Sequence, residues 1–124
     1  STVNLDPSGR LTGLLKRADF VRVQNRGNRH RGRCLLLMVH PSESENSRVG
    51  LTVSRKVGNA VVRNRVRRRL RELIRAKPEL FISGQDYVFI ARARAATAGS
   101  STLHKEVEWL LNQVSLQGGP PRSL

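Results

Sequence analysis

One stretch of the chain, residues 55–75, combines the apolar spacing of a helix with a high density of positive charge. Apolar side chains recur on a single helix face, at Val62, Val66, Leu70, Leu73 and Ile74. Nine basic residues lie in the same stretch, against a single acid, Glu72. Such a helix buries its apolar side against the rest of the protein and offers the other side to a polyanion. Nucleic acid is therefore the leading class of partner.

A helical wheel of 100° per residue separates the two kinds of side chain. The side opposite the apolar residues carries one amide and four arginines, namely Asn64, Arg67, Arg68, Arg71 and Arg75. Like charges four residues apart destabilise a helix by a few tenths of a kcal/mol per pair, so a purely solvated face normally alternates bases with acids. The pattern therefore favours a binding face. We expect Asn59 to cap this helix and Pro78 to end it near Lys77.

Composition narrows the class of partner further. The formal net charge is +14, and the sequence pI is about 11.8. No stretch approaches the roughly 20 apolar residues of a membrane span, and the basic helix has no Trp or Phe on its apolar side. Nucleic acid thus fits better than a membrane. Arginine outnumbers lysine by 19 to 4, which reflects either bidentate phosphate binding or GC-rich codon usage, two compatible explanations.

The single cysteine, Cys34, excludes a disulfide within the chain and a cysteine-rich zinc site. The N-terminus lacks the apolar segment of a secretory signal. We therefore expect a cytoplasmic protein.

The other segments predict an α+β protein. The expected elements, in chain order, are a helix at 16–25, a basic loop at 26–33, strands at 34–39 and 48–54, the arginine-rich helix, a strand at 87–93 and a helix at 103–114. The first two strands are joined by a short polar turn, which suggests an antiparallel hairpin. The order is α-β-β-α-β-α, with a further short strand possible.

We predict one domain, because 124 residues suit a single core. The expected architecture is a single two-layer sandwich, one sheet with helices packed on it, over residues 14–115. Residues 1–13 read as a flexible tail. Residues 116–124, which include Gly-Gly-Pro-Pro, read as a disordered one.

The segment from Lys56 to Glu72 resembles the signature of the bacterial ribonuclease P protein family, in which Arg63-Asn64-Arg65 is the "RNR" motif. Other segments agree with that family in order and spacing. They are Ala18-Asp19-Phe20 with Gly27, the strand from Arg48 to Lys56, and the strand from Asp86 to Arg92. The resemblance covers about residues 14–114 and is more specific than a basic helix alone.

This resemblance implies a fold and a function. The arginine-rich helix would join two parallel strands by a left-handed crossover, which is rare. The protein would assist a large catalytic RNA that removes the 5′ leader of precursor tRNA to form the mature 5′ end. Magnesium ions would be held mainly by the RNA, with one protein per RNA. The chain would then be a subunit of an endoribonuclease holoenzyme, inactive alone.

The resemblance also implies two binding surfaces. The surface for the catalytic RNA comprises Arg55, Lys56, Arg63, Asn64, Arg65, Arg67, Arg68 and Arg71. The surface for the 5′ leader comprises Phe20, Gln24, Asn28, Leu36, Met38, Thr52 and Ser54. Phe20 can stack on a base without reading its identity, although a core phenylalanine is the alternative. Gln24 and Met38 stand where relatives often carry aromatic residues, so the stacking area is smaller here.

We expect no catalytic or metal site on the protein itself. His30, His40 and His104 are scattered, and Glu106 and Glu108 point in different directions on a helix. Trp109 reads more readily as a core residue or partly buried cap than as a stacking platform. The alternative function is that of a ribosomal or general RNA-binding protein without a role in cleavage; the collinear motifs favour the ribonuclease P subunit.

Overall fold

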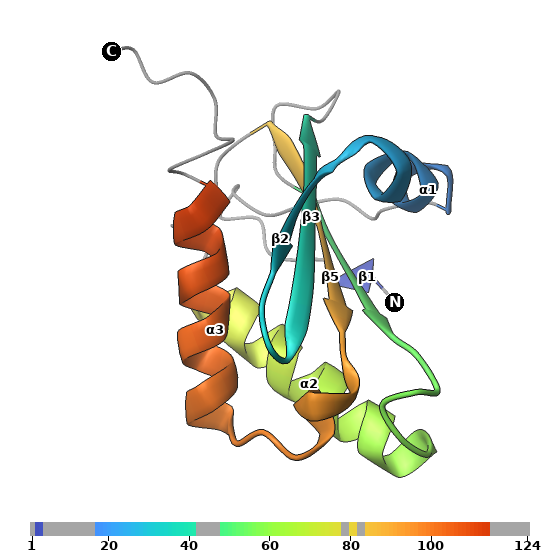
Figure 1. Cartoon of the computed structure of the whole chain (residues 1–124), viewed down its shortest axis with the longest axis vertical. Coiled ribbons are helices and arrows are strands. Elements are labelled where there is room, and N and C mark those ends of the chain that lie inside the picture. Colours follow the sequence, from blue (N-terminus) through green and yellow to red (C-terminus); the bar gives the residue numbers. More distant parts are fainter. Residues whose placement is uncertain (1, 4–16, 42–47, 78–79, 82–83, 115–124) are drawn as a thin grey trace.

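The structure is a computed structural model that describes residues 2–3, 17–41, 48–77, 80–81 and 84–114. Its sheet has five strands in the order β1-β4-β5-β3-β2 (Figure 1). The strands are β1 (Thr2–Val3), β2 (Asn28–Arg31), β3 (Leu35–Pro41), β4 (Arg48–Val53) and β5 (Gln85–Ala91). The helices are α1 (Arg17–Arg26), α2 (Ala60–Ala76), the short 3-10 helix η2 (Ala93–Ala96) and α3 (Ser100–Gln113). The predicted α+β class is confirmed.

The centre of the sheet is β5, which runs parallel to β4 and antiparallel to β3. Helix α2 connects β4 to β5, which confirms the crossover between parallel strands that the resemblance implies. The hairpin predicted between the strands at 34–39 and 48–54 is wrong, because β5 lies between them. A short link favours pairing of consecutive strands. However, β5 is apolar on both faces, and a strand of that kind belongs in the middle of a sheet that is covered on both sides.

The segment predicted as a basic loop, 26–33, contains the edge strand β2. This strand pairs antiparallel with β3, and Arg31 lies opposite Leu36. Its sequence, Asn-Arg-His-Arg, has little strand propensity, and charged side chains are typical of sheet edges. The loop prediction is therefore wrong for these residues, and β2 is a short strand of the kind left open by the sequence.

The opposite edge of the sheet is formed by β1, whose two residues pair with Val49 and Gly50. The sequence predicts a tail over residues 1–13, so this pairing ties part of that segment to the domain. Residue 1 and residues 4–13 of that range lie outside the described residues, as does the predicted tail at 116–124.

Two hydrophobic clusters lie on opposite faces of the sheet. The larger one joins the sheet to α2 and α3, and fully buried Leu37, Leu51 and Phe89 lie at its centre. The smaller one consists of Val23 of α1, Met38 of β3 and Val88 of β5. Since successive residues of a strand point to opposite faces, Leu37 and Met38 enter different clusters. Figure 1 shows α1 apart from α2 and α3, as this division requires.

Helix α2 takes the orientation that its apolar spacing predicts. Val66, Leu70 and Ile74 have no exposed surface, and Val62 and Leu73 pack against the same cluster. The predicted caps are also confirmed. The Asn59 side chain accepts a hydrogen bond of 2.9 Å from the Val62 amide, and the helix ends at Ala76. The basic side of α2 therefore points away from the larger cluster.

Strand β5 begins two residues earlier than the predicted strand at 87–93 and includes Asp86. An aspartate after Ser-Gly-Gln reads as part of a turn. Here its side chain is fully buried, and the Arg48 guanidinium donates to both carboxylate oxygens at 2.8 Å. This bidentate ion pair offsets the cost of burying the charge. It also joins the two parallel strands.

Helix α1 is held against the sheet by a close backbone approach at Gly27. The Gly27 amide donates to the Val23 carbonyl at 2.7 Å. A Cβ atom at this position would lie 2.4 Å from the Val23 oxygen and 2.8 Å from the Val39 oxygen. Only glycine therefore allows the chain to leave α1 and enter β2 along this path. Helix α1 accordingly ends at Arg26, the residue before this glycine.

Candidate nucleic-acid interface

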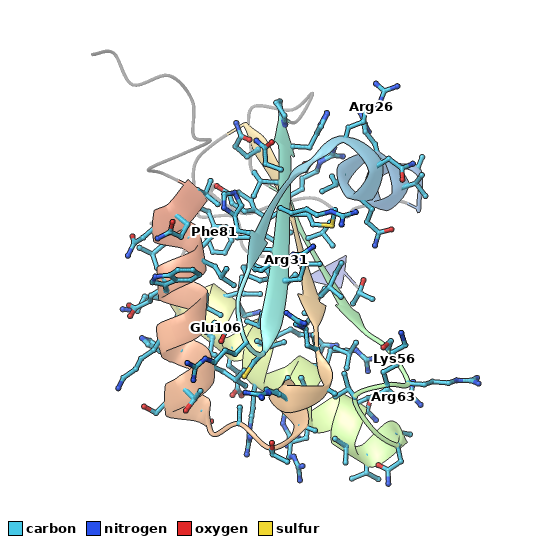
Figure 2. All side chains as sticks on the ribbon, viewed as in Figure 1. Arg26, Arg31, Lys56, Arg63, Phe81 and Glu106 are labelled. Atoms are coloured by element: carbon cyan, nitrogen blue, oxygen red, sulfur yellow. The ribbon has the colours of Figure 1, made fainter. Side chains whose placement is uncertain are left out.

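The first candidate surface is the arginine face, comprising the basic turn before α2 and the outward side of α2. Arg55 and Lys56 are exposed in that turn, ahead of the N-terminus of α2. Figure 2 shows Lys56 and Arg63 at the same end of the molecule. The helix N-terminus adds positive potential there, which favours a phosphate. On the helix itself, Asn64 and Arg68 are exposed. The other predicted contacts are half-buried along their stems, namely Arg63, Arg65, Arg67 and Arg71.

Local hydrogen bonds orient part of this face. The Arg63 Nε donates to the Gly58 carbonyl at 3.2 Å. The Arg67 Nη1 donates to the Asn64 Oδ1 at 2.7 Å, so Asn64 holds an arginine in place. Arg69 behaves differently, because its Nη1 donates to the Ala98 carbonyl and ties α2 to the loop before α3. The face is thus partly preorganised.

Two donors on this face lack partners among the described residues. The Nε atoms of Arg65 and Arg67 are buried and donate to no acceptor there. A buried donor without an acceptor is costly, and a phosphate oxygen is the strongest acceptor for a guanidinium. The described part of the protein therefore leaves the hydrogen-bonding capacity of these two arginines incompletely used.

The acids outside α2 whose side chains the structure describes are engaged in structural bonds. Asp86 pairs with Arg48, and the Glu106 carboxylate accepts from three backbone amides. A hydrogen bond from Lys77 lowers the pKa of Glu108, and the His104 ring contacts the same carboxylate. Glu72 is exposed on α2 itself. Because Asp86, Glu106 and Glu108 are committed to structural bonds, Glu72 is left as the one acid of α2 that offsets its positive field.

The second candidate surface lies on the sheet face that carries α1. The register places four residues of four neighbouring strands side by side, which we call the cross-strand row: Arg31, Leu36, Ile90 and Thr52. Leu36, Ile90 and Thr52 are half-buried, and Arg31 is exposed. The row therefore combines apolar contact area, a hydroxyl and a guanidinium, which together suit an extended polyanion with unstacked bases.

The structure brings together some of the residues predicted for the leader and separates others. Leu36 and Thr52 share the cross-strand row, and Ser54 follows at the exposed end of β4. Gln24 is half-buried on α1. Met38 is only 2% exposed beneath α1, where it packs with Val23 and Val88. It supports the surface and offers no contact area.

Asn28 is exposed, but its register partner is Val39, a residue of the larger cluster. The start of β2 therefore sets Asn28 on the face opposite the cross-strand row. The side chain of Phe20 lies outside the described residues. The backbone of Phe20 belongs to α1, as predicted.

Sequence reasoning missed two members of the row. Ile90 follows from the alternation of Asp86, Val88 and Ile90 on one side of β5, so a period-two pattern in that segment was the available signal. Arg31 required the recognition of β2 as a strand, for which the sequence carries little signal. His30 is buried on the core side of β2, where burial lowers its pKa. His30 is therefore a neutral side chain of the core and does not contact phosphate.

The described residues contain no group of three or more His, Cys, Asp or Glu side chains placed to hold a metal ion. Within the same residues, no helix has the length and apolar character needed to cross a membrane.

Comparison with known proteins converges on one family. The sequence profile of the family described as Ribonuclease P matches residues 9–115. The ribonuclease P protein component of Erythrobacter litoralis is 37% identical over 110 residues, covering 88% of this chain and 90% of the relative. That of Dehalococcoides mccartyi is 41% identical over 103 residues, covering 83% and 84%.

Solved structures agree with these sequence relatives. The Staphylococcus aureus RNase P protein matches with a TM-score of 0.74 at 27% identity, covering 86% of this chain and 95% of that one. The RNase P protein from Thermotoga maritima matches with a TM-score of 0.72 at 26% identity, covering 78% and 92%. The similarity thus extends over nearly the whole of each solved chain.

Proposed function

Since the chain belongs to the ribonuclease P protein family, we propose that it is the protein subunit of ribonuclease P. In this proposal it binds the catalytic RNA subunit and the 5′ leader of precursor tRNA. It thereby assists the endonucleolytic cut that forms the mature tRNA 5′ end. The observation that carries the proposal is the outward arginine face of α2 on a fold shared with ribonuclease P proteins.

The arginine face is the proposed contact with the catalytic RNA. Its guanidinium groups bind phosphates bidentately, and it carries almost no acid. Asn64 contributes by holding Arg67, while Arg63 is held by the backbone of the preceding turn. Arg55 and Lys56 extend the positive surface beyond the helix N-terminus. Such contacts give affinity for an RNA backbone, and the shape of the folded RNA supplies the specificity.

The cross-strand row is the proposed contact with the 5′ leader. A single strand can place its bases on the apolar surface of Leu36 and Ile90, with Thr52 and Ser54 as hydrogen-bonding groups. Arg31 at the sheet edge supplies a charge for a phosphate. From α1, Gln24 offers an amide. Phe20 is included as the residue that stacks on a base, because the family resemblance implies that role. Met38 supports this surface from beneath α1, and Asn28 lies on the opposite face of the sheet.

The protein's share of catalysis in this proposal is positioning. Holding the leader on the sheet while α2 binds the catalytic RNA fixes the cleavage site relative to the RNA's reactive groups. Magnesium would be held mainly by RNA phosphates, with one protein per RNA. The site of action would be the cytoplasm.

Reconstitution tests this function. The protein alone is expected to cleave no precursor tRNA, and to raise the activity of the catalytic RNA at low magnesium and about physiological ionic strength. The reason is that the basic side chains of the protein replace part of the magnesium that offsets the repulsion between the catalytic RNA and precursor tRNA. The measurement is the rate of leader release with and without protein. A rate that the protein leaves unchanged would contradict the assignment and favour a general RNA-binding protein.

The leader proposal predicts a substrate-specific effect of Phe20→Ala. The holoenzyme's affinity for precursor tRNA should fall about tenfold, because stacking of one base contributes roughly 1–3 kcal/mol. Affinity for mature tRNA, which lacks the leader, should not change. The matched control is Val21→Ala on the same helix, since Val21 is 44% exposed. Equal losses for both tRNAs, or none for precursor tRNA, would show that Phe20 does not stack on the leader.

A further inference from the structure

A further pocket lies between the β2–β3 turn and helix α3, and it shares only Arg31 with the two proposed surfaces. Its volume is about 380 Å³, within the range of small-ligand sites. The side chains that line it include Arg31, Arg33, Thr102, Lys105, Glu106 and Trp109. Trp109 is 50% exposed, although the sequence favoured a core or capping role for it. Its exposed indole forms part of the pocket wall together with the cations.

The turn that forms one wall is fastened to α3 by a single carboxylate. Glu106 accepts hydrogen bonds from the backbone amides of Arg33, Cys34 and Leu35 at 3.2, 2.8 and 2.6 Å. The turn is also closed by the Gly32 amide, which donates to the Leu35 carbonyl at 2.8 Å. Figure 2 shows Glu106 on α3 beside this turn.

Gly32 is required for the close approach of this carboxylate. A Cβ atom there would lie 2.4 Å from a Glu106 carboxylate oxygen. Arg92 adds a bond of 3.0 Å to the Gly32 carbonyl. The turn is therefore rigid, and Arg33 projects from a fixed frame next to the helix that carries Trp109.

The charges of the pocket are unbalanced, because three cations surround a single acid. Glu106 is committed to the three amides, whereas Arg31, Arg33 and Lys105 are exposed. An indole face with neighbouring cations suits a planar group that carries a negative charge. A nucleobase stacks on the indole and its phosphate lies within reach of the cations. An acidic peptide would use the cations but has no need of the indole face.

We propose that this pocket binds an unpaired nucleotide of RNA, with its base on Trp109 and its phosphate on Arg33 and Lys105. The pocket adjoins the cross-strand row at the edge strand β2, because Arg31 belongs to both. The nucleotide can come from the 5′ leader or from an unpaired segment of the catalytic RNA. This site is additional to the two surfaces of the proposed function, although it shares Arg31 with the cross-strand row. The source of its nucleotide rests on the proposed function.

Trp109 is the only tryptophan of the chain, so its fluorescence reports on this pocket alone. Titration of the free protein with a short single-stranded oligoribonucleotide is expected to quench that fluorescence. Quenching should persist in an Arg68→Ala/Arg71→Ala variant, which impairs the arginine face and leaves the pocket intact. In parallel, anisotropy of the labelled oligonucleotide should show about tenfold weaker binding for Trp109→Ala, and a smaller loss for Trp109→Phe, which keeps a ring. Arg33→Ala should lower the salt slope of binding by about one unit.

The two RNA sources are separated in the reconstituted holoenzyme. A Trp109→Ala defect confined to leader-bearing precursor tRNA assigns the pocket to the leader, and a defect in binding of the catalytic RNA assigns it to that subunit. Unchanged fluorescence at saturating oligonucleotide would overturn the proposal, as would equal quenching by a poly-glutamate peptide. The fluorescence assay needs no catalytic RNA, so its failure is distinct from failed reconstitution.

Discussion

Replacing Arg68 and Arg71 together with alanine is expected to weaken binding of the protein to the catalytic RNA about 100-fold. Each guanidinium is proposed to hold one phosphate, and a hydrogen bond to a charged group contributes about 1.5 kcal/mol or more, roughly a tenfold change in affinity. The slope of log affinity against log salt should fall by about two units, one for each lost phosphate contact. The measurement is equilibrium binding at several salt concentrations. Both residues lie on the outward side of α2, away from the buried Val66, Leu70 and Ile74, so the fold should be retained.

The matched control is Arg75→Ala. Arg75 lies on the same helix, carries the same charge and is exposed, but it lies beyond the resembling motif. Its loss should weaken binding less than the loss of Arg71 does. If the two single substitutions weaken binding equally, the helix acts as undifferentiated positive charge, and the motif positions have no special role.

Asp86→Asn is expected to lower the free energy of unfolding by about 3 kcal/mol, because it removes one charge of a largely buried ion pair while the Arg48 guanidinium keeps its own. Asp86 is fully buried, and the Arg48 side chain is only 18% exposed. The asparagine keeps the shape of the side chain but removes the charge that both Arg48 nitrogens contact. The ion pair joins β4 to β5, the parallel strands on either side of the α2 crossover. Urea denaturation followed by circular dichroism measures the change.

Glu108→Gln provides the comparison with an exposed ion pair. Glu108 binds Lys77 at 2.9 Å, but its side chain is 37% exposed, so solvent screens the interaction. The unfolding midpoint should move little. An equal loss of stability in the two variants would show that burial of the Arg48–Asp86 pair has no special effect on the fold.

The sequence predicts correctly those features that depend on residues close together in the chain. Helix α2 has five apolar residues on one face and a capping asparagine, and each signal depends only on neighbours within a few turns. The family resemblance rests on the same kind of contiguous motif. The sequence did not predict the pairing of the strands, because the order β4-β5-β3 depends on contacts between segments far apart in the chain. Strand β2 was missed because its hydrogen bonds to β3 form it despite a charged sequence.

The same contrast holds for the two proposed binding surfaces: the sequence predicted the arginine face, whereas the fold set the cross-strand row. The sequence by itself determined that α2 presents arginines outward, since helical periodicity sorts its side chains whatever the rest of the fold does. Only the tertiary structure decided which sheet residues share a face. Cross-strand register sets Ile90 and Arg31 beside Leu36 and Thr52, sets Asn28 on the opposite face, and leaves Met38 beneath α1. It also decided that Glu106 would fasten a distant turn and that Trp109 would remain half-exposed beside Arg33, because those contacts join residues more than 70 positions apart.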